Sequence, residues 1–343
     1  MDTITMLFAM SALLQAVWHV VQPFMDALPD LLGPAALAIV VDPVTLEKGL
    51  KTTFFKAYDA GTPFYPTVCT EVPSTAKEEK YGWLGTAPVM SEWVDERSAQ
   101  GLLDHDYTIV NNHYEATLSV DKDSLEDDQT NQLDTRVSDM ASRARRHPDS
   151  LLATLLTNGE STACYDGQYF FDTDHSEGDS GTLDNDLTYD ATDHTAVTQA
   201  EFKLAFKAAL EKLLSYTDDR GQPFLEDWEL NSSNLVAIVP YQLRQAALET
   251  LNADLISNTT NVYQNQARVV VNTRLSSGAK WYLAYTGAPI KPFIFQNRQP
   301  IRSGFLGDQS ESGFMRRYYH FGVDARYNMG YGLWQFCVLT TFN

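Results

Sequence analysis

The fold of this chain is decided by residues 81–128, YGWLGTAPVMSEWVDERSAQGLLDHDYTIVNNHYEATLSVDKDSLEDD. In the second half of this stretch, polar and apolar residues alternate from His113 to Val120, and a period of two predicts extended chain. Asn111-Asn112 interrupts the alternation, as a hairpin tip or a bend does. We expect an extended arm over Tyr81–Val120, with two usable faces and no partner strand nearby. Such an arm suits contact with a neighbouring subunit better than it suits a small-substrate site.

A long helix is predicted to follow the arm, over Leu125–Leu156. Ser124 is placed to cap its start. Acidic residues crowd the first turn and arginines stand near the other end, so the charges stabilise the helix dipole at both ends. The acidic residues are therefore better explained by helix electrostatics than by paired catalytic carboxylates. Pro148 predicts a kink or a restart, and Gly159 ends the pattern.

Residues 1–41 form an apolar N-terminal extension. Thr3–Met25 contains no charged residue when His19 is neutral, and the first basic residue of the chain is Lys48. Secretory signals and membrane helices usually have basic flanks, which are missing here. Polar residues recur at helical spacing, at Ser11, Gln15, His19 and Gln22. This stripe favours an amphipathic helix docked on protein, with a membrane helix and a mis-assigned start codon as the alternatives.

From residue 42 onward, helices and strands mix without a repeated strand–helix–strand order. A helix is predicted over residues 42–61, then an extended linker over 62–79, and a long acidic loop over Ala163–Asp193. Thr198 and Glu201 form a capping box for a further helix. This mixture predicts the α+β class. Strands are expected over Leu235–Val239, Ala267–Val271, Trp281–Tyr285, Phe293–Phe295 and much of Phe314–Phe342, and a helix over Gln242–Leu251.

Motifs for catalysis and cofactor binding are missing from the sequence. It contains no phosphate-binding loop, dinucleotide fingerprint or HExxH zinc motif. Residues 178–181, GDSG, resemble a serine-protease signature, but their acidic surroundings indicate a plain turn. Asp172, Asp174, His175 and Asp179 have the ligand types for a hard cation, although a solvated acidic loop is favoured. We predict no catalytic residue, no cofactor and no metal site, with a hydrolase that uses Asp172 or Asp174 as a minor alternative.

Charge and cysteine content narrow the class of protein. A formal net charge of −20 repels nucleic acid, so any DNA nearby is enclosed and not gripped. The three cysteines, Cys69, Cys164 and Cys337, have no CxxC spacing, which predicts free thiols in a reducing compartment. The seven histidines have no obvious Cys or Ser partner nearby. These features describe an acidic, non-enzymatic protein with the character of a self-assembling shell subunit.

Five stretches of the chain resemble the major head (capsid) subunit of Mu-like phages and prophages. The resemblance extends from about Asp42 to near the C-terminus and leaves residues 1–41 outside it. The stretches are residues 81–97 (YGWLG and SEWVDER), 107–128 (YTIVNNHYEATLSVDKDSLEDD), 163–175 (ACYDGQYFFDTDH), 291–300 (KPFIFQNRQP) and 327–336 (YNMGYGLWQF).

This resemblance implies the major capsid fold of tailed phages and herpesviruses, which has an N-arm, an E-loop, a P-domain with a long spine helix, and an A-domain. The chain then divides into residues 1–41 as the N-terminal apolar extension, 42–87 as the N-arm, 88–122 as the E-loop hairpin, 123–162 as the P-domain spine helix, 163–286 as the A-domain, and 287–343 as the return strands of the P-domain.

The resemblance also implies a function. Copies of the subunit form hexamers and pentamers of an icosahedral head around packaged double-stranded DNA, without sequence-specific binding. The protein belongs to the virion, is assembled in the host cytoplasm with portal and scaffold or protease proteins, and leaves room for a decoration protein. An encapsulin-like compartment with an enzyme cargo is the alternative on the same fold. Some related capsids crosslink an E-loop lysine to a neighbour, but Ser91–Asp121 contains no lysine, so we expect no such crosslink.

Candidate inter-subunit contacts lie in and around the arm. Large aromatic and arginine side chains are enriched at the centres of buried interfaces, and we expect Trp93 and Tyr107 to be anchors. Deleting Ser91–Val120 is expected to leave a soluble subunit that cannot close shells. The full set of candidates is Trp83, Trp93, Arg97, Tyr107 and Tyr114.

Overall fold

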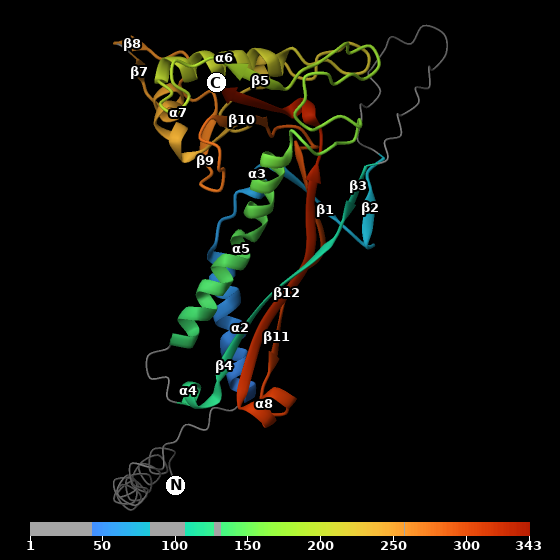
Figure 1. Ribbon diagram of the computed structural model, residues 1–343, viewed down its shortest axis with the longest axis vertical. Helices are drawn as coiled ribbons and strands as arrows, with labels where there is room; N and C mark the ends of the chain where they lie inside the picture. Colours follow the sequence, from blue (N-terminus) through green and yellow to red (C-terminus); the bar gives the residue numbers. More distant parts are fainter. Residues whose placement is uncertain (1–42, 83–106, 127–131, 257) are drawn as a thin grey trace, which may run out of the picture.

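The chain folds into an elongated lobe, built on two helices and a four-stranded sheet, and a broader lobe around a five-stranded sheet (Figure 1). The computed structural model describes residues 43–82, 107–126, 132–256 and 258–343. The helix predicted within residues 1–41 lies outside the described residues, as do Trp83, Trp93 and Arg97. The α+β class predicted from the sequence is confirmed.

The sheet of the elongated lobe has the strand order β1-β11-β12-β4. β1 (Cys69–Pro73) pairs in parallel with β11 (Phe293–Leu306), and β12 (Tyr318–Tyr331) then pairs antiparallel with both β11 and β4 (Asn112–Asp121). Two helices, α2 (Pro43–Ala60) and α5 (Gln132–Asn158), pack beside each other against this sheet (Figure 1). Their shared core contains Leu50, Phe54, Leu133, Val137, Ala141, Phe321 and Val323.

The second lobe, which we call the upper lobe, contains the larger core. Its sheet has the order β5-β13-β10-β6-β9, and α6 (Gln199–Leu214) and α7 (Arg244–Leu251) pack against it. The predicted capping box is confirmed, because the Thr198 side chain accepts a hydrogen bond from the Glu201 N–H and the Glu201 carboxylate accepts one from Thr198. The five strands are β5 (Asp186–Tyr189), β13 (Cys337–Phe342), β10 (Lys280–Tyr285), β6 (Leu235–Val239) and β9 (Arg268–Val271).

The described part of the predicted arm has partner strands within its own chain, so that expectation is wrong. β4 pairs with β12 along its whole length, from Asp121 opposite Tyr318 to Asn112 opposite Tyr327. β3 (Thr108–Val110) pairs with β2 (Glu78–Lys80) and not with β4, so Asn111 separates two strands that do not pair with each other and is not a hairpin tip. The predicted linker over residues 62–79 is likewise wrong, because it contains α3 (Tyr65–Val68), β1 and the start of β2. The alternation over residues 113–120 indicates a strand, but it does not identify a partner strand that lies about 200 residues away in the sequence.

The long helix is confirmed over most of its predicted length, with two differences. α5 continues through Pro148 as one helix instead of restarting there. A carboxylate oxygen of the next residue, Asp149, accepts hydrogen bonds from the N–H groups of Phe64 and Tyr65, which ties α5 to α3. Nearer the start, Ser124 lies inside the separate short helix α4 (Lys122–Glu126), and Asp121 caps that helix by accepting from the N–H groups of residues 123 and 124.

The remaining elements are short and connect the strands and helices described above. α8 (Glu311–Arg316) connects β11 to β12 at the tip of the elongated lobe, so the prediction of extended chain from Phe314 is wrong at its start (Figure 1). Within the described ranges, no helix combines the length and the hydropathy required to cross a membrane. The other short elements are β7 (Leu255–Ile256), β8 (Thr259–Thr260) and the 3-10 turns Asp227–Glu229, Tyr241–Leu243 and Trp334–Phe336.

Candidate functional site

Residues with a potential functional role gather at three places: a groove in the elongated lobe, the base of the arm, and a buried polar centre in the upper lobe. The groove lies between α5 and the sheet and has a volume of about 610 Å³. Tyr114 lines it, with its ring centroid 4.5 Å from that of His147 and 4.9 Å from that of Tyr327. Further lining side chains, mostly aromatic or aliphatic, include Tyr58, Tyr65, Met140, Phe295, Ile301 and Val323.

Charged side chains also line this groove, and each of them already has a partner within the subunit: Glu71, Glu115, Arg143, Arg145 and Asp324. Arg145 donates to the backbone carbonyl of Gly61 and lies 4.8 Å from the centroid of the Tyr58 ring. Burial lowers the pKa of His147, and the positive charge of Arg274 lowers it further, so the imidazole is favoured in its neutral form. The groove therefore suits an apolar or aromatic segment of protein better than a charged small molecule.

The base of the arm is firmly anchored inside the subunit. The N–H of Tyr81 donates to the carbonyl of Tyr107 over 2.7 Å, so these two residues lie next to each other although 25 residues separate them in the sequence. The buried Tyr81 hydroxyl donates to Gln296 over 2.6 Å, and the Gln296 amide donates to the carbonyl of Ile109. These bonds hold residues 81 and 107 against β11, whatever the intervening chain contacts.

Two of the five predicted contact residues are described, and they do not lie together. The Tyr107 hydroxyl accepts a hydrogen bond from the N–H of Tyr331 over 2.9 Å, and burial raises the pKa of this phenol to about 12. Tyr107 also packs against the subunit's own core and is partly buried there, and its predicted contact with a neighbouring subunit stays a prediction. Tyr114 is half-buried in the groove and keeps a face open to a partner.

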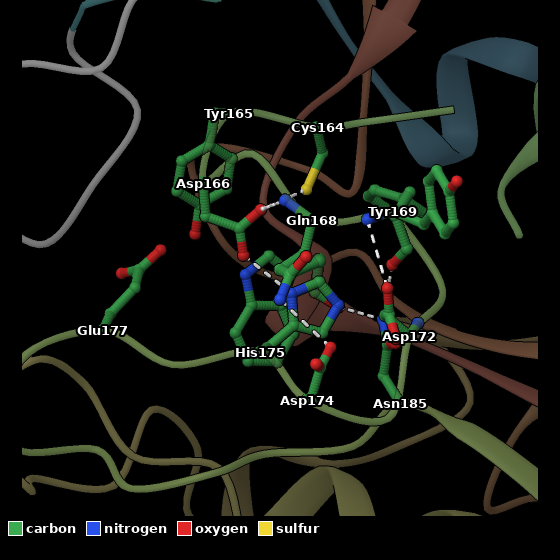
Figure 2. A network of polar contacts seen from close by, with 12 residues as sticks. Cys164, Tyr165, Asp166, Gln168, Tyr169, Asp172, Asp174, His175, Glu177 and Asn185 are labelled. Carbon is green, nitrogen blue, oxygen red and sulfur yellow. Dashed lines mark hydrogen bonds and ion pairs between the residues drawn. The ribbon is translucent and has the colours of Figure 1, made fainter. Parts of the chain in front are cut away.

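The buried polar centre consists of Cys164, Asp166 and His175 (Figure 2). One carboxylate oxygen of Asp166 accepts from the Cys164 thiol at 2.9 Å, and the other lies 2.7 Å from Nδ1 of His175. The His175 ring is fully buried and stacks on Trp334, with the ring centroids 4.0 Å apart. The expectation that His175 belongs to a solvated loop, without a Cys partner nearby, is therefore wrong.

Electrostatics at this centre argue against nucleophilic chemistry. Burial raises the pKa of the Cys164 thiol well above its ordinary value, and the negative charge of Asp166 raises it further, so the reactive thiolate does not form at neutral pH. Burial alone would raise the pKa of Asp166, but the hydrogen bonds from His175 and Cys164 outweigh it and hold that pKa below the usual value. The centre is built to keep a carboxylate charged and enclosed.

The cation site suggested by the sequence does not assemble as a set. Among the described residues, the potential ligands that come within 4.8 Å of one another are Cys164, Asp166 and His175, and not Asp172, Asp174 or Asp179. Asp172 instead accepts hydrogen bonds from neighbouring N–H groups of its own loop. One signal in the sequence could have indicated that this segment is buried. Residues 164–175, CYDGQYFFDTDH, contain several large aromatic residues close to Cys164, Asp166 and His175.

The GDSG segment is a turn, as predicted. Gly178 and Gly181 have φ values of +53° and +73°, which a residue with a side chain adopts only with strain. The Ser180 hydroxyl accepts from the N–H of Glu177 and donates to the carbonyl of Gly181. Ser180 is thus engaged in local backbone bonds, as turn residues commonly are.

A cluster of charges joins the end of α5 to the five-stranded sheet. Lys280 forms an ion pair with Glu160, and Asp186 lies within range of both charges. Burial raises the pKa of Asp186 to about 6, and the negative charge of Glu160 adds to the shift. The ionised carboxylate is therefore less stable in the folded chain than in the unfolded chain.

Replacing Asp186 with Asn is expected to stabilise the subunit above pH 6 and to have little effect below pH 4. The native carboxylate destabilises the fold only when ionised, so stability falls as the pH rises through the folded pKa of about 6. We expect a gain in the free energy of unfolding of about 1–2 kcal/mol at pH 8, because the side chain is only partly buried. Urea denaturation between pH 4 and pH 8 measures it, with exposed Asp190→Asn as the control. A gain of equal size at pH 4 would contradict this electrostatic cause.

Comparison with known proteins gives matches over most of the chain. The family model described as Mu-like prophage major head subunit gpT matches residues 44–202 and 264–341. The Mu-like prophage FluMu major head subunit of Haemophilus influenzae is 26% identical over 272 residues, which cover 79% of this chain and 64% of that protein. The major capsid protein of Escherichia phage Mu is 34% identical over 141 residues, or 40% of this chain and 46% of that protein. The chain thus spans less than two thirds of the length of either relative.

Solved structures show the same architecture. A chain of the bacteriophage JBD30 procapsid is 26% identical, with a TM-score of 0.52 over 88% of this chain and 76% of that one. A chain of the mature capsid of bacteriophage PhiM1 is only 11% identical, but it has a TM-score of 0.55 over 82% of this chain and 88% of that one. The second likeness concerns the fold alone.

Proposed function

Because this chain belongs to the Mu-like prophage major head subunit gpT family, we propose that it is a major capsid protein that self-assembles into the icosahedral shell of a phage head. Its fold is that of tailed-phage capsid subunits. The observation that carries the proposal is the family match, which covers the arm, α5 and the return strands of the same chain. The proposed role is structural, without enzymatic activity.

The shape and the charge of the subunit support this role. The elongated lobe exposes a groove of about 610 Å³ lined by aromatic side chains, and a surface of this kind suits contact with other copies of the chain. A formal net charge of −20 suits enclosure of double-stranded DNA without binding to its sequence, because like charges keep the genome from adhering to the wall. Hexamers and pentamers are the proposed assembly units.

The proposal includes the domain boundaries that were predicted from the sequence. Residues 42–87 form the N-arm, 88–122 the E-loop, 123–162 the spine-helix region, 163–286 the A-domain and 287–343 the return strands. The proposed contacts with neighbouring copies are Trp83, Trp93, Arg97, Tyr107 and Tyr114. Portal, scaffold or protease, and decoration proteins are proposed partners, with assembly in the host cytoplasm and incorporation into the virion.

Electron microscopy of particles from phage-producing cells, with mass spectrometry of the subunit, tests the proposal. We expect icosahedral shells in which this chain is the main protein, and absorbance at 260 nm that indicates packaged DNA. Denaturing electrophoresis should give a single subunit band, because Ser91–Asp121 contains no lysine for an E-loop crosslink. A ladder of covalently linked subunits would refute the prediction that no crosslink forms, but it would leave the proposed function intact. Shells that lack nucleic acid and contain an enzyme would contradict the proposed phage head and would support an encapsulin-like compartment instead.

A further inference from the structure

The N-terminal extension has no role in the proposed function. The family match begins at residue 44 and α2 begins at Pro43, so residues 1–42 lie outside both. Residues 3–22 contain no Asp, Glu, Lys or Arg, and their polar residues fall in one stripe at helical spacing. A helix that is apolar over most of its surface requires a partner that buries it. Because basic flanks are missing, protein is favoured over a membrane as that partner.

The apolar face opposite the polar stripe has the spacing of a helix that docks in a groove. This spacing, with intervals of four, three, four and three residues, places the side chains on one face of a helix. Two of them are Met, whose flexible side chain fills irregular gaps. The five residues are Met6, Met10, Leu13, Val17 and Val20.

The groove of the elongated lobe has an apolar surface that the described residues leave uncovered. Its walls include Met140 and Ala144 of α5 and Ile301 of β11, which are apolar but only partly buried. A volume of about 610 Å³ accommodates a few side chains of one helix face and not a whole helix. Because the charged side chains of the groove already have partners, an uncharged segment can enter without leaving a buried charge unpaired.

The helix that follows the extension leads from the tip of the elongated lobe to this groove. α2 and α5 run in the same direction, because Thr53 donates to Asp134 and Arg145 donates to the carbonyl of Gly61. Tyr58, in the last turn of α2, lines the groove. It follows Pro43 by 15 positions of helix, which is a distance of about 22 Å.

Residues 23–42 are long enough to bring the extension back over that distance. Pro23, Pro29 and Pro34 predict that this connection is not a continuous helix. A flexible chain of 20 residues has a root-mean-square end-to-end distance of about 25 Å, close to the span along α2. A linker that matches its span gives an effective concentration in the millimolar range, which favours docking within one subunit over docking on another copy in dilute solution.

We propose that residues 3–22 form a helix that docks its apolar face in the groove of its own subunit. The polar stripe then faces solvent. The docked helix would cover a surface that is proposed for contacts between copies, so it would have to leave before a neighbouring copy could use the groove. The docking itself does not rest on the proposed function, because it takes place within one chain and requires no shell.

A photoreactive residue in the full chain tests where the apolar face lies. Leu13 or Val17 is replaced by a benzophenone amino acid, which bonds to a nearby C–H group on irradiation. We expect crosslinks to α5 or β11, identified by mass spectrometry of the band that migrates as a single subunit. Gln15, in the polar stripe, is the matched control position and should give few crosslinks or none.

A second set of variants tests the groove. Met140→Glu places a charge on its wall and should abolish the crosslinks. Leu204→Glu, at an exposed apolar side chain of α6 in the upper lobe, should leave them unchanged. Circular dichroism establishes that each variant is folded, and Ile301→Glu replaces Met140→Glu if the latter does not fold.

Three results would overturn the proposal. They are crosslinks that fall outside the groove or join two subunits, crosslinks that persist in a folded groove variant, and the absence of any crosslink from Leu13 and Val17. Particle assembly is not a readout of this experiment. Docking of the extension and the proposed function can therefore fail separately.

Discussion

A subunit in which residues 84–105 are replaced by a short glycine-containing turn is expected to fold and stay soluble but to form no shells. The chain can be closed there because β2 and β3 are antiparallel, with Lys80 opposite Thr108. The N–H of Tyr81 also donates to the carbonyl of Tyr107 over 2.7 Å. Two adjacent chain ends in this geometry accept a hairpin loop of two to about five residues.

The described core does not depend on the removed residues. Both hydrophobic clusters are built from residues 46–81 and from residues after 106, and the bonds that anchor Tyr81 and Tyr107 are kept. What the variant loses is the proposed contact segment with Trp93 and Arg97. Assembly depends on many weak contacts repeated around a symmetric shell, so removal of one repeated contact is expected to prevent closure completely.

Size-exclusion chromatography with light scattering, followed by electron microscopy, measures this outcome. Circular dichroism and a cooperative unfolding transition establish that the variant is folded, and the unmodified chain purified in parallel is the control. Shells of normal size from the variant would refute the role of the segment. The deletion of Ser91–Val120 tests the arm less cleanly, because it also removes β3 and nearly all of β4, and β12 would lose one of its two partner strands.

Local signals in the sequence predicted individual elements well. The capping box at Thr198 and the spacing of apolar residues identified α6, and the apolar run Leu235–Val239 identified β6. In each case the information lies within one turn or one strand, where side-chain periodicity follows from backbone geometry. The long helix α5 was also recognised, although its continuity through Pro148 depends on tertiary packing around that turn.

Contacts between distant segments were beyond the reach of such signals. The alternation in β4 correctly indicates a strand, but its partner β12 lies about 200 residues further along and was not apparent. The centre at Cys164 and His175 was missed for a related reason. Charged residues at 172, 174 and 179 suggested a solvated loop, whereas the His175 ring is buried and stacks on Trp334. Phe170 and Phe171 of the same loop are buried as well. Burial of a loop is decided by what packs over it.

Replacing Asn185 with Ala is expected to lower the free energy of unfolding by about 3–4 kcal/mol, a large loss for a single substitution. The fully buried Asn185 amide donates to the carbonyls of Phe170 at 2.8 Å and Cys337 at 3.2 Å. Its side-chain oxygen accepts from the N–H of Asp172 at 2.9 Å. One side chain thus joins the acidic loop to the start of β13.

The size of the effect follows from what remains after truncation. Alanine leaves two buried carbonyls and one N–H without these bonds, and each buried polar group left unsatisfied costs about 1–3 kcal/mol. Removal of the amide also leaves a small cavity beside Trp334, which adds to the loss. Asn112→Ala is the matched control, because Asn112 is exposed and makes only a 3.4 Å contact with the Tyr114 hydroxyl; its effect should stay within about 0.5 kcal/mol.

Each substitution is made in the subunit whose residues 84–105 are replaced by a short turn, and the free energy of unfolding is measured by urea denaturation. Because that subunit is expected not to assemble, subunit association does not contribute to the measured difference. Equal slopes of the unfolding free energy against urea concentration would show that both proteins unfold from the same compact state. A loss below about 1 kcal/mol for Asn185→Ala would mean that water replaces the amide and that the loop is not held at this point. A large loss would identify Asn185 as the residue through which the acidic loop and the C-terminal strand unfold together, because no other side chain among those described bonds to both Phe170 and Cys337.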